Sequence, residues 1–141
     1  MSLDVIIVED NEEDLREVSN CLADANVCEP ENVCSAATYD EACELISDRA
    51  IHTDVVLLDL NIPRNSTDSR PEKGHGKRVL DHVHELNKQA RVHVQVIIVS
   101  AEELADDFEK DLMMRVYKGT LVGSARKDSL PVMPRSGCGV W

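Results

Sequence analysis

The chain has 141 residues, of which 43% are hydrophobic and 3% are aromatic. This length supports one domain with a sizeable core, which has to be aliphatic. Acidic residues outnumber basic ones by 27 to 15, and the net charge of −12 argues against nucleic acid as a partner, because phosphate backbones repel such a surface. No apolar run is long enough to cross a bilayer and the N-terminus lacks the features of a secretory signal, so we expect a cytoplasmic protein with no membrane partner.

The spacing of the five cysteines and five histidines does not match the common zinc motifs. In a cytoplasmic chain the cysteines stay reduced, and we expect them to act as small hydrophobic side chains in the core. We expect the histidines to be exposed to solvent. The cysteines are Cys21, Cys28, Cys34, Cys43 and Cys138, and the histidines are His52, His75, His82, His84 and His93.

Short β-branched runs alternate with amphipathic helical stretches along the first half of the chain. The run Val5–Val8 is continuously apolar, which is typical of a strand buried on both faces. Apolar residues spaced by three or four predict a helix over residues 15–25, and residues 32–38 predict a weaker strand. Thr38 then begins a second helix, with Glu41 placed to complete a capping box.

The second half of the chain repeats this alternation. A buried strand is predicted at Val55–Leu58, and further strands at residues 94–99 and 119–125. Two more helices are predicted by the apolar stripes Val79, Leu80, Val83 and Leu86, and Leu104, Phe108 and Leu112. Five strands that alternate with four helices predict an open α/β sheet of parallel strands joined by right-handed crossovers.

Two stretches interrupt the alternation. Residues 64–75 contain no large apolar side chain but do contain a proline and a glycine, which predicts a mobile loop. Residues 131–141 contain two prolines and two glycines, so we expect an irregular tail instead of a helix.

Polar side chains follow four of the predicted strands at the point where each strand ends. They are Glu9 and Asp10 after the first strand, Asp59 after the third, Ser100 after the fourth and Lys127 after the fifth. Because the carboxyl ends of parallel strands meet at one edge of a sheet, where ligands bind, we expect these side chains to converge on one crevice.

Such a cluster fits phosphoryl transfer. Neighbouring carboxylates repel one another unless a hard cation such as Mg²⁺ relieves the repulsion, and a carboxylate can also act as the nucleophile. Each residue alone has a simpler interpretation: Glu9 and Asp10, with Asn11, can cap the first helix, and Ser100 can cap the next one. A nucleotide site is disfavoured, because no glycine-rich turn follows the first strand.

Over about residues 3–130 the chain resembles the receiver domain of two-component response regulators. The resemblance is carried by Val5–Asn11, Val55–Pro63, Gly76 with Val79–Leu80, Val96–Ala101 and Lys127. It implies a doubly wound, five-stranded parallel sheet of flavodoxin-like order 2-1-3-4-5, with a receiver domain at 3–130 and an irregular tail at 131–141. It also implies a signalling phosphoacceptor that catalyses only its own phosphorylation and dephosphorylation, and not an enzyme with an external substrate.

The resemblance further assigns roles to single residues and to partners. Asp59 would accept a phosphoryl group from a histidine kinase or a histidine phosphotransfer protein, Ser100 would contact that group and Lys127 would pair with it. Glu9, Asp10, Asp59 and the main-chain carbonyl of Asn61 would bind Mg²⁺. The output would be a contact with a downstream protein or effector domain.

The chain also departs from the usual receiver pattern. Ser124 stands where the family usually has an aromatic residue, Asp128 follows Lys127 in place of proline, and the loop before Gly76 is longer than usual. The fifth helix is missing from the sequence pattern, which would leave part of one sheet face open and favours a homodimer. Two alternatives remain: a docking module that works without phosphorylation, and a haloacid-dehalogenase-like phosphatase, disfavoured because Asp59-Leu60-Asn61 is not its DxD motif.

Overall fold

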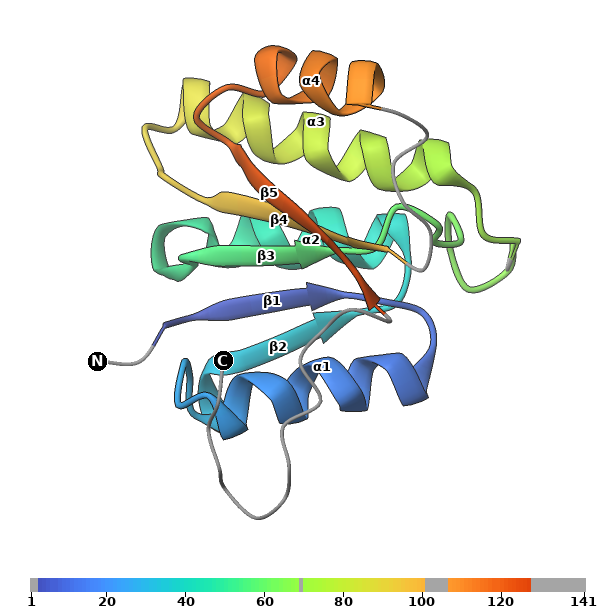
Figure 1. Ribbon diagram of the computed structural model, residues 1–141, viewed down its shortest axis with the longest axis vertical. Helices are drawn as coiled ribbons and strands as arrows, with labels where there is room; N and C mark the ends of the chain where they lie inside the picture. The colour runs from blue at the N-terminus through green and yellow to red at the C-terminus, as the bar shows by residue number, and fades with distance from the viewer. Residues whose placement is uncertain (1–2, 69, 101–106, 128–141) are drawn as a thin grey trace.

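The computed structural model describes residues 3–68, 70–100 and 107–127 of the chain. Its strands form one parallel sheet of order β2-β1-β3-β4-β5 (Figure 1). They are β1 (Val5–Val8), β2 (Val33–Ala36), β3 (Val55–Leu58), β4 (Gln95–Ser100) and β5 (Leu121–Arg126). The predicted class, strand number and strand order are confirmed; β1 and β3 have the predicted ends, and the ends of the other strands are displaced by one or two residues.

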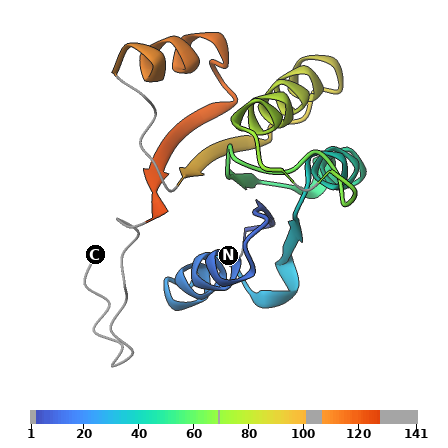
Figure 2. The same ribbon diagram turned by 90° about the vertical axis from the view of Figure 1, so that its right-hand side faces the viewer.

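Within the described residues, four helices connect the strands, and they lie on both sides of the sheet (Figure 2). α1 (Glu12–Asp24) lies on one side, whereas α2 (Tyr39–Arg49) and α3 (Lys73–Gln89) lie on the other, together with α4 (Asp107–Val116). Single 3-10 turns at Pro30–Asn32 and Ala50–His52 precede β2 and follow α2. The predicted missing fifth helix and the predicted tail fall beyond residue 127, outside the described residues.

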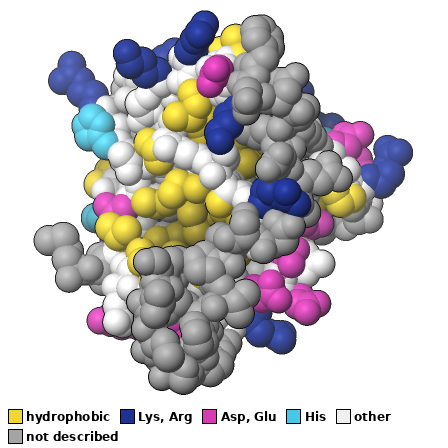
Figure 3. All heavy atoms as spheres, viewed as in Figure 1, with side chains coloured by type: hydrophobic (Ala, Val, Ile, Leu, Met, Phe, Trp, Pro, Cys, Tyr) yellow, Lys and Arg dark blue, Asp and Glu magenta, His cyan; other side chains and the backbone are white. Residues whose placement is uncertain are grey.

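Alternate residues of β1 supply the two halves of the core. Ile6 and Val8 pack into a cluster with α2 and α3 that includes Ile46. Val5 and Ile7 face the opposite side and pack with Val18 of α1. All four residues of β1 are at most 3% exposed, as expected for a parallel strand covered on both faces. On the face drawn in Figure 3, hydrophobic side chains gather over the middle of the sheet.

The helix starts follow from short polar side chains. The Asn11 side chain accepts hydrogen bonds from the Glu13 and Asp14 amides, each at 3.0 Å, and so caps α1. Thr38 caps α2 by accepting from the Glu41 amide at 3.1 Å, as predicted. The Glu41 carboxylate reaches back to the amide of residue 37 at 3.4 Å, one residue earlier than a capping box requires.

The interior of α4 differs from the predicted stripe. Leu112 is 48% exposed, whereas the adjacent Met113 is 5% exposed and packs into the core. The helix is therefore rotated by one residue relative to the predicted apolar face. Leu104 and the side chain of Phe108, the other two predicted stripe residues, lie outside the described part of the structure.

Two further predictions are corrected. The helix α3 begins at Lys73, so the last three residues of the predicted 64–75 loop are helical, and His75 is buried at 8% exposure. His82 and His84 are half-buried, which leaves only His52 and His93 exposed as predicted. Of the cysteines, Cys28 is buried as expected, Cys21, Cys34 and Cys43 are half-buried, and Cys138 lies outside the described residues. None of the helices within the described ranges is long and apolar enough to cross a membrane.

Candidate functional site

The carboxyl edge of the sheet brings together the acids that follow β1 and β3. The Glu9 amide donates to the Ala36 carbonyl at 2.9 Å, and the Asp59 amide donates to the Val8 carbonyl at 3.0 Å. These bonds extend the hydrogen-bond ladder of the sheet by one residue beyond β1 and β3. They therefore fix the backbone positions from which the Glu9 and Asp59 side chains project. Glu9 and Asp59 are buried, at 4% and 5% exposure, so neither is a solvated surface acid.

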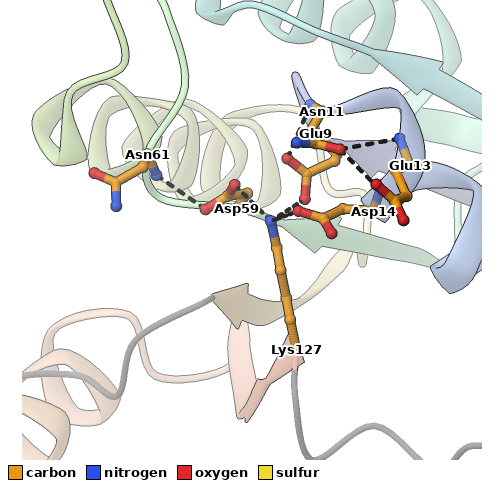
Figure 4. Close-up of polar contacts among 7 residues, drawn as sticks. All are labelled: Glu9, Asn11, Glu13, Asp14, Asp59, Asn61 and Lys127. Carbon is orange, nitrogen blue, oxygen red and sulfur yellow. Dashed lines mark hydrogen bonds and ion pairs between the residues drawn. The ribbon is translucent and has the colours of Figure 1, made fainter.

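Lys127, directly after β5, reaches across this edge and contacts three carboxylates (Figure 4). Its Nζ lies 2.9 Å from Oδ2 of Asp14 and 3.2 Å from Oδ2 of Asp59, and it forms an ion pair with Glu9. The Lys127 side chain is 14% exposed. Sequence reasoning predicted Glu9, Asp59 and Lys127 at this edge, but it missed Asp14, which lies in the first turn of α1.

Burial and mutual repulsion shift the acid–base behaviour of the cluster. Burial, together with the charge of Asp59, raises the pKa of Glu9 to about 8, even though the hydrogen bond from Lys127 acts in the opposite direction. Burial alone would lower the pKa of Lys127, but hydrogen bonds to Glu9 and Asp14 and the charges of Asp59 and Glu9 outweigh it and raise that pKa. Lys127 therefore stays cationic at neutral pH, and the site holds more acid than this one cation neutralises.

Backbone amides orient the two buried carboxylates. The Asn61 amide donates to Oδ1 of Asp59 at 3.0 Å, and the Asn11 amide donates to Oε2 of Glu9 at 3.3 Å. Each acid is thus held by the backbone two residues further along the chain (Figure 4). The segment that carries the Asn61 carbonyl is tied directly to the Asp59 side chain.

Three of the predicted metal ligands lie close enough to share one cation. One oxygen from each of Glu9, Asp10 and Asp59 can be chosen so that all three lie within 4.8 Å of one another. Oxygen donors with uncompensated negative charge suit a hard divalent cation, and Mg²⁺ accepts one or two carboxylates along with waters. The donor set therefore fits Mg²⁺.

The remaining predicted site residue, Ser100, is the last residue of β4 and pairs with Arg126 of β5. This register places the Ser100 backbone at the same edge of the sheet, opposite Arg126, the residue that directly precedes Lys127. Its side chain lies outside the described part of the structure. Ser124, which stands where the resemblance to receiver domains predicts an aromatic residue, is half-buried and pairs with Ile98.

Gly76 holds the start of α3 against the residues that follow Asp59. Its amide donates to the Leu60 carbonyl at 3.1 Å. A Cβ atom at position 76 would lie 2.3 Å from Cα of Leu60, so only glycine permits this approach. Leu60 and Ile62 are fully buried, which fixes the chain on both sides of Asn61.

Known proteins that resemble this chain are found by structure and not by sequence. No protein-family model matches the sequence, and no curated protein matches it either. Solved structures do match. The receiver domain of the histidine kinase CKI1 from Arabidopsis thaliana, complexed with Mg²⁺, is 16% identical with a TM-score of 0.66, over 89% of this chain and 83% of that one.

Two bacterial structures are similar to a comparable degree. One is a CheX–CheY complex with BeF3 and Mg from Borrelia burgdorferi, with 21% identity, a TM-score of 0.61, and coverage of 87% of this chain and 78% of that one. The other is a signal receiver domain from Vibrio parahaemolyticus, with 20% identity, a TM-score of 0.61, and coverage of 90% and 79%. The chain therefore has the fold of the signal receiver domains of response regulators and histidine kinases.

Proposed function

We propose that the domain at residues 3–130 is a phosphoacceptor receiver that takes a phosphoryl group on Asp59 in a Mg²⁺-dependent reaction. The observation that carries this proposal is the cluster of the buried Glu9 and Asp59 with the half-buried Asp10 and Lys127, at the carboxyl edge of a sheet with the receiver fold. A buried acid cluster has a cost in stability, which a merely structural edge would avoid with neutral side chains.

The residues divide the chemistry among them. A carboxylate oxygen of Asp59 attacks the phosphorus of a phosphohistidine, the new O–P bond forms as the P–N bond breaks, and the donor imidazole leaves with the electron pair. Glu9, Asp10, Asp59 and the Asn61 carbonyl would hold Mg²⁺, which supplies charge neutralisation for the phosphoryl oxygens. Lys127 supplies a second positive charge next to Asp59, and Ser100 would contact the phosphoryl group.

The proposed donor is a histidine kinase or a histidine phosphotransfer protein. One similar structure is the receiver domain of a histidine kinase, and another is a CheY in complex with CheX and Mg, which supports protein partners of this general kind. Phosphorylation of Asp59 would change how Lys127 is shared among Glu9, Asp14 and Asp59. The altered edge would then bind or release a downstream protein or effector domain, so the chain acts as a signalling switch and not as an enzyme.

Intact-mass analysis after incubation with acetyl phosphate and Mg²⁺ tests this function. We expect a mass increase of one phosphoryl group, which hydroxylamine removes and which requires Mg²⁺. Asp59→Asn should abolish the adduct, whereas the control Asp48→Asn, at an exposed position in α2, should retain it. Absence of any adduct would indicate a docking module, and continuous phosphate release would indicate a phosphatase; either result would refute the proposal.

A further inference from the structure

His75 is a buried titratable side chain that the proposed phosphoryl chemistry does not use. It lies in the first turn of α3 at 8% exposure, and among the described residues it is the only buried histidine. Its imidazole is engaged at both nitrogens. Nδ1 lies 2.9 Å from the Ile62 carbonyl oxygen, and Nε2 lies 3.1 Å from Oε2 of Glu72.

The Ile62 carbonyl and the Glu72 carboxylate hold the His75 ring in one orientation. A carbonyl oxygen only accepts hydrogen bonds, so Nδ1 of His75 must carry a proton and donate it to Ile62. On its other side the ring lies against the Glu72 carboxylate, because Nε2 is 3.1 Å from Oε2. The ring therefore bonds to Ile62 and Glu72 at the same time and cannot rotate away without losing both contacts.

Ile62 and Glu72 are the two ends of the loop that follows Asp59. They form an isolated antiparallel bridge, and the Glu72 amide donates to the Ile62 carbonyl at 3.0 Å. The same carbonyl oxygen thus accepts from Glu72 and from His75. With the bond from the Gly76 amide to the Leu60 carbonyl at 3.1 Å, residues 72–76 are fastened to residues 60–62. The loop between Ile62 and Glu72 is therefore closed at its base.

We propose that His75 is a positioning residue for the phosphoacceptor site, because it holds the backbone of residues 60–62 next to Asp59. The Asn61 amide donates to Asp59 at 3.0 Å. A displacement of Ile62 would therefore move its neighbour Asn61 and, through this hydrogen bond, the acceptor carboxylate. The Asn61 carbonyl, a proposed ligand of Mg²⁺, moves with the same segment. The inference rests on the proposed function for its consequence, but the loop closure itself depends only on contacts within the chain.

The experiment compares His75→Leu with His75→Asn in the full chain. Leucine keeps the buried bulk and loses both hydrogen bonds, whereas the asparagine amide can still donate to the Ile62 carbonyl. His82→Leu is the matched control. His82 also lies in α3, but its ring contacts the Ser47 hydroxyl of α2 at 2.8 Å and not the loop between Ile62 and Glu72. Two quantities are measured: amide hydrogen exchange at Glu72 and Gly76, and Mg²⁺ affinity by calorimetry.

We expect His75→Leu to accelerate exchange at Glu72 and Gly76 about fivefold, the effect of losing the hydrogen bond to the Ile62 carbonyl, and to weaken Mg²⁺ binding about tenfold. His75→Asn should restore both quantities, and His82→Leu should change neither. Unchanged exchange and unchanged Mg²⁺ affinity in folded His75→Leu would overturn the inference. If that variant does not fold, His75→Asn and Glu72→Gln take its place: faster exchange at Glu72 and Gly76 with unchanged Mg²⁺ affinity in either variant would overturn the inference, because the loop would then open without any effect on the metal site.

The two readouts separate this inference from the proposed function. A wild-type chain that binds no Mg²⁺ would refute the proposed metal site and with it the proposed consequence of loop closure. Exchange at Glu72 and Gly76 would then still decide whether His75 holds the loop. Equal Mg²⁺ affinities of the wild type and His75→Leu would leave the proposed function standing and refute the positioning role.

Discussion

The raised pKa of Glu9 predicts a specific dependence of stability on pH. Burial and the neighbouring Asp59 move this pKa from 4.5 to about 8 in the folded chain. Between these values the folded chain binds about one more proton than the unfolded chain, so the free energy of unfolding falls as pH rises. One proton corresponds to a slope of about 1.4 kcal/mol per pH unit near the middle of the window. The full difference across the window is on the order of 5 kcal/mol.

Chemical unfolding followed by circular dichroism at pH 5.5, 6.5 and 7.5, with EDTA present, measures this slope. Other titrating groups contribute too, so the wild type is compared with Glu9→Gln, which keeps the shape of the side chain and cannot ionise. We expect the wild type to lose stability relative to Glu9→Gln as pH rises. Lys127 does not contribute to the slope, because its pKa is raised from 10.5 and its stabilising effect is lost only above that value.

Saturating Mg²⁺ should remove most of this slope, because the cation binds the ionised carboxylate and lowers the pKa of Glu9. Glu17→Gln, at an exposed position in α1, should behave as the wild type under both conditions. Parallel pH profiles for the wild type and Glu9→Gln without metal would contradict this prediction, since they would mean that Glu9 ionises in the folded chain as it does in the unfolded chain.

Three further substitutions test other parts of the account. Asp10→Ala should abolish the Mg²⁺-dependent rise in melting temperature measured by differential scanning fluorimetry; an unchanged rise would place the metal elsewhere. Lys127→Met leaves Glu9, Asp14 and Asp59 without the cation that contacts them and should cost about 2 kcal/mol or more of unfolding free energy in EDTA at pH 7.5; a neutral effect would contradict the ion pairs described. Gly76→Ala should cost about 1–3 kcal/mol in the same denaturant assay, because its Cβ would meet the Leu60 backbone; an equally stable variant would contradict the close approach.

The sequence predicted the sheet because local and global signals agree. Each buried strand is a short run of β-branched or leucine residues, and the helices between them carry apolar stripes, so the alternation determines a parallel sheet. The acids follow those runs directly, which is why Glu9, Asp10 and Asp59 could be placed at one edge before the structure was known. Their roles in binding metal and phosphoryl groups remain predictions.

Other features could not be predicted, for identifiable physical reasons. Asp14 lies in the first helical turn, where acids are common because they favour the helix dipole, so its contact with Lys127 left no signal. In α4, Leu112 and Met113 are both apolar, and periodicity alone does not say which one faces the core. The burial of His75 depends on the Ile62 carbonyl, a tertiary partner 13 residues away.

The decisive experiment identifies the residue that carries the phosphoryl group. After reaction with acetyl phosphate and Mg²⁺, borohydride reduction converts an aspartyl phosphate into homoserine, which peptide mass spectrometry locates in the sequence. The account predicts homoserine at position 59 in the wild type, dependent on Mg²⁺ and absent from Asp59→Asn. Homoserine at Asp10 or another acid, or an unmodified Asp59 peptide under conditions in which Mg²⁺ is bound, would contradict it.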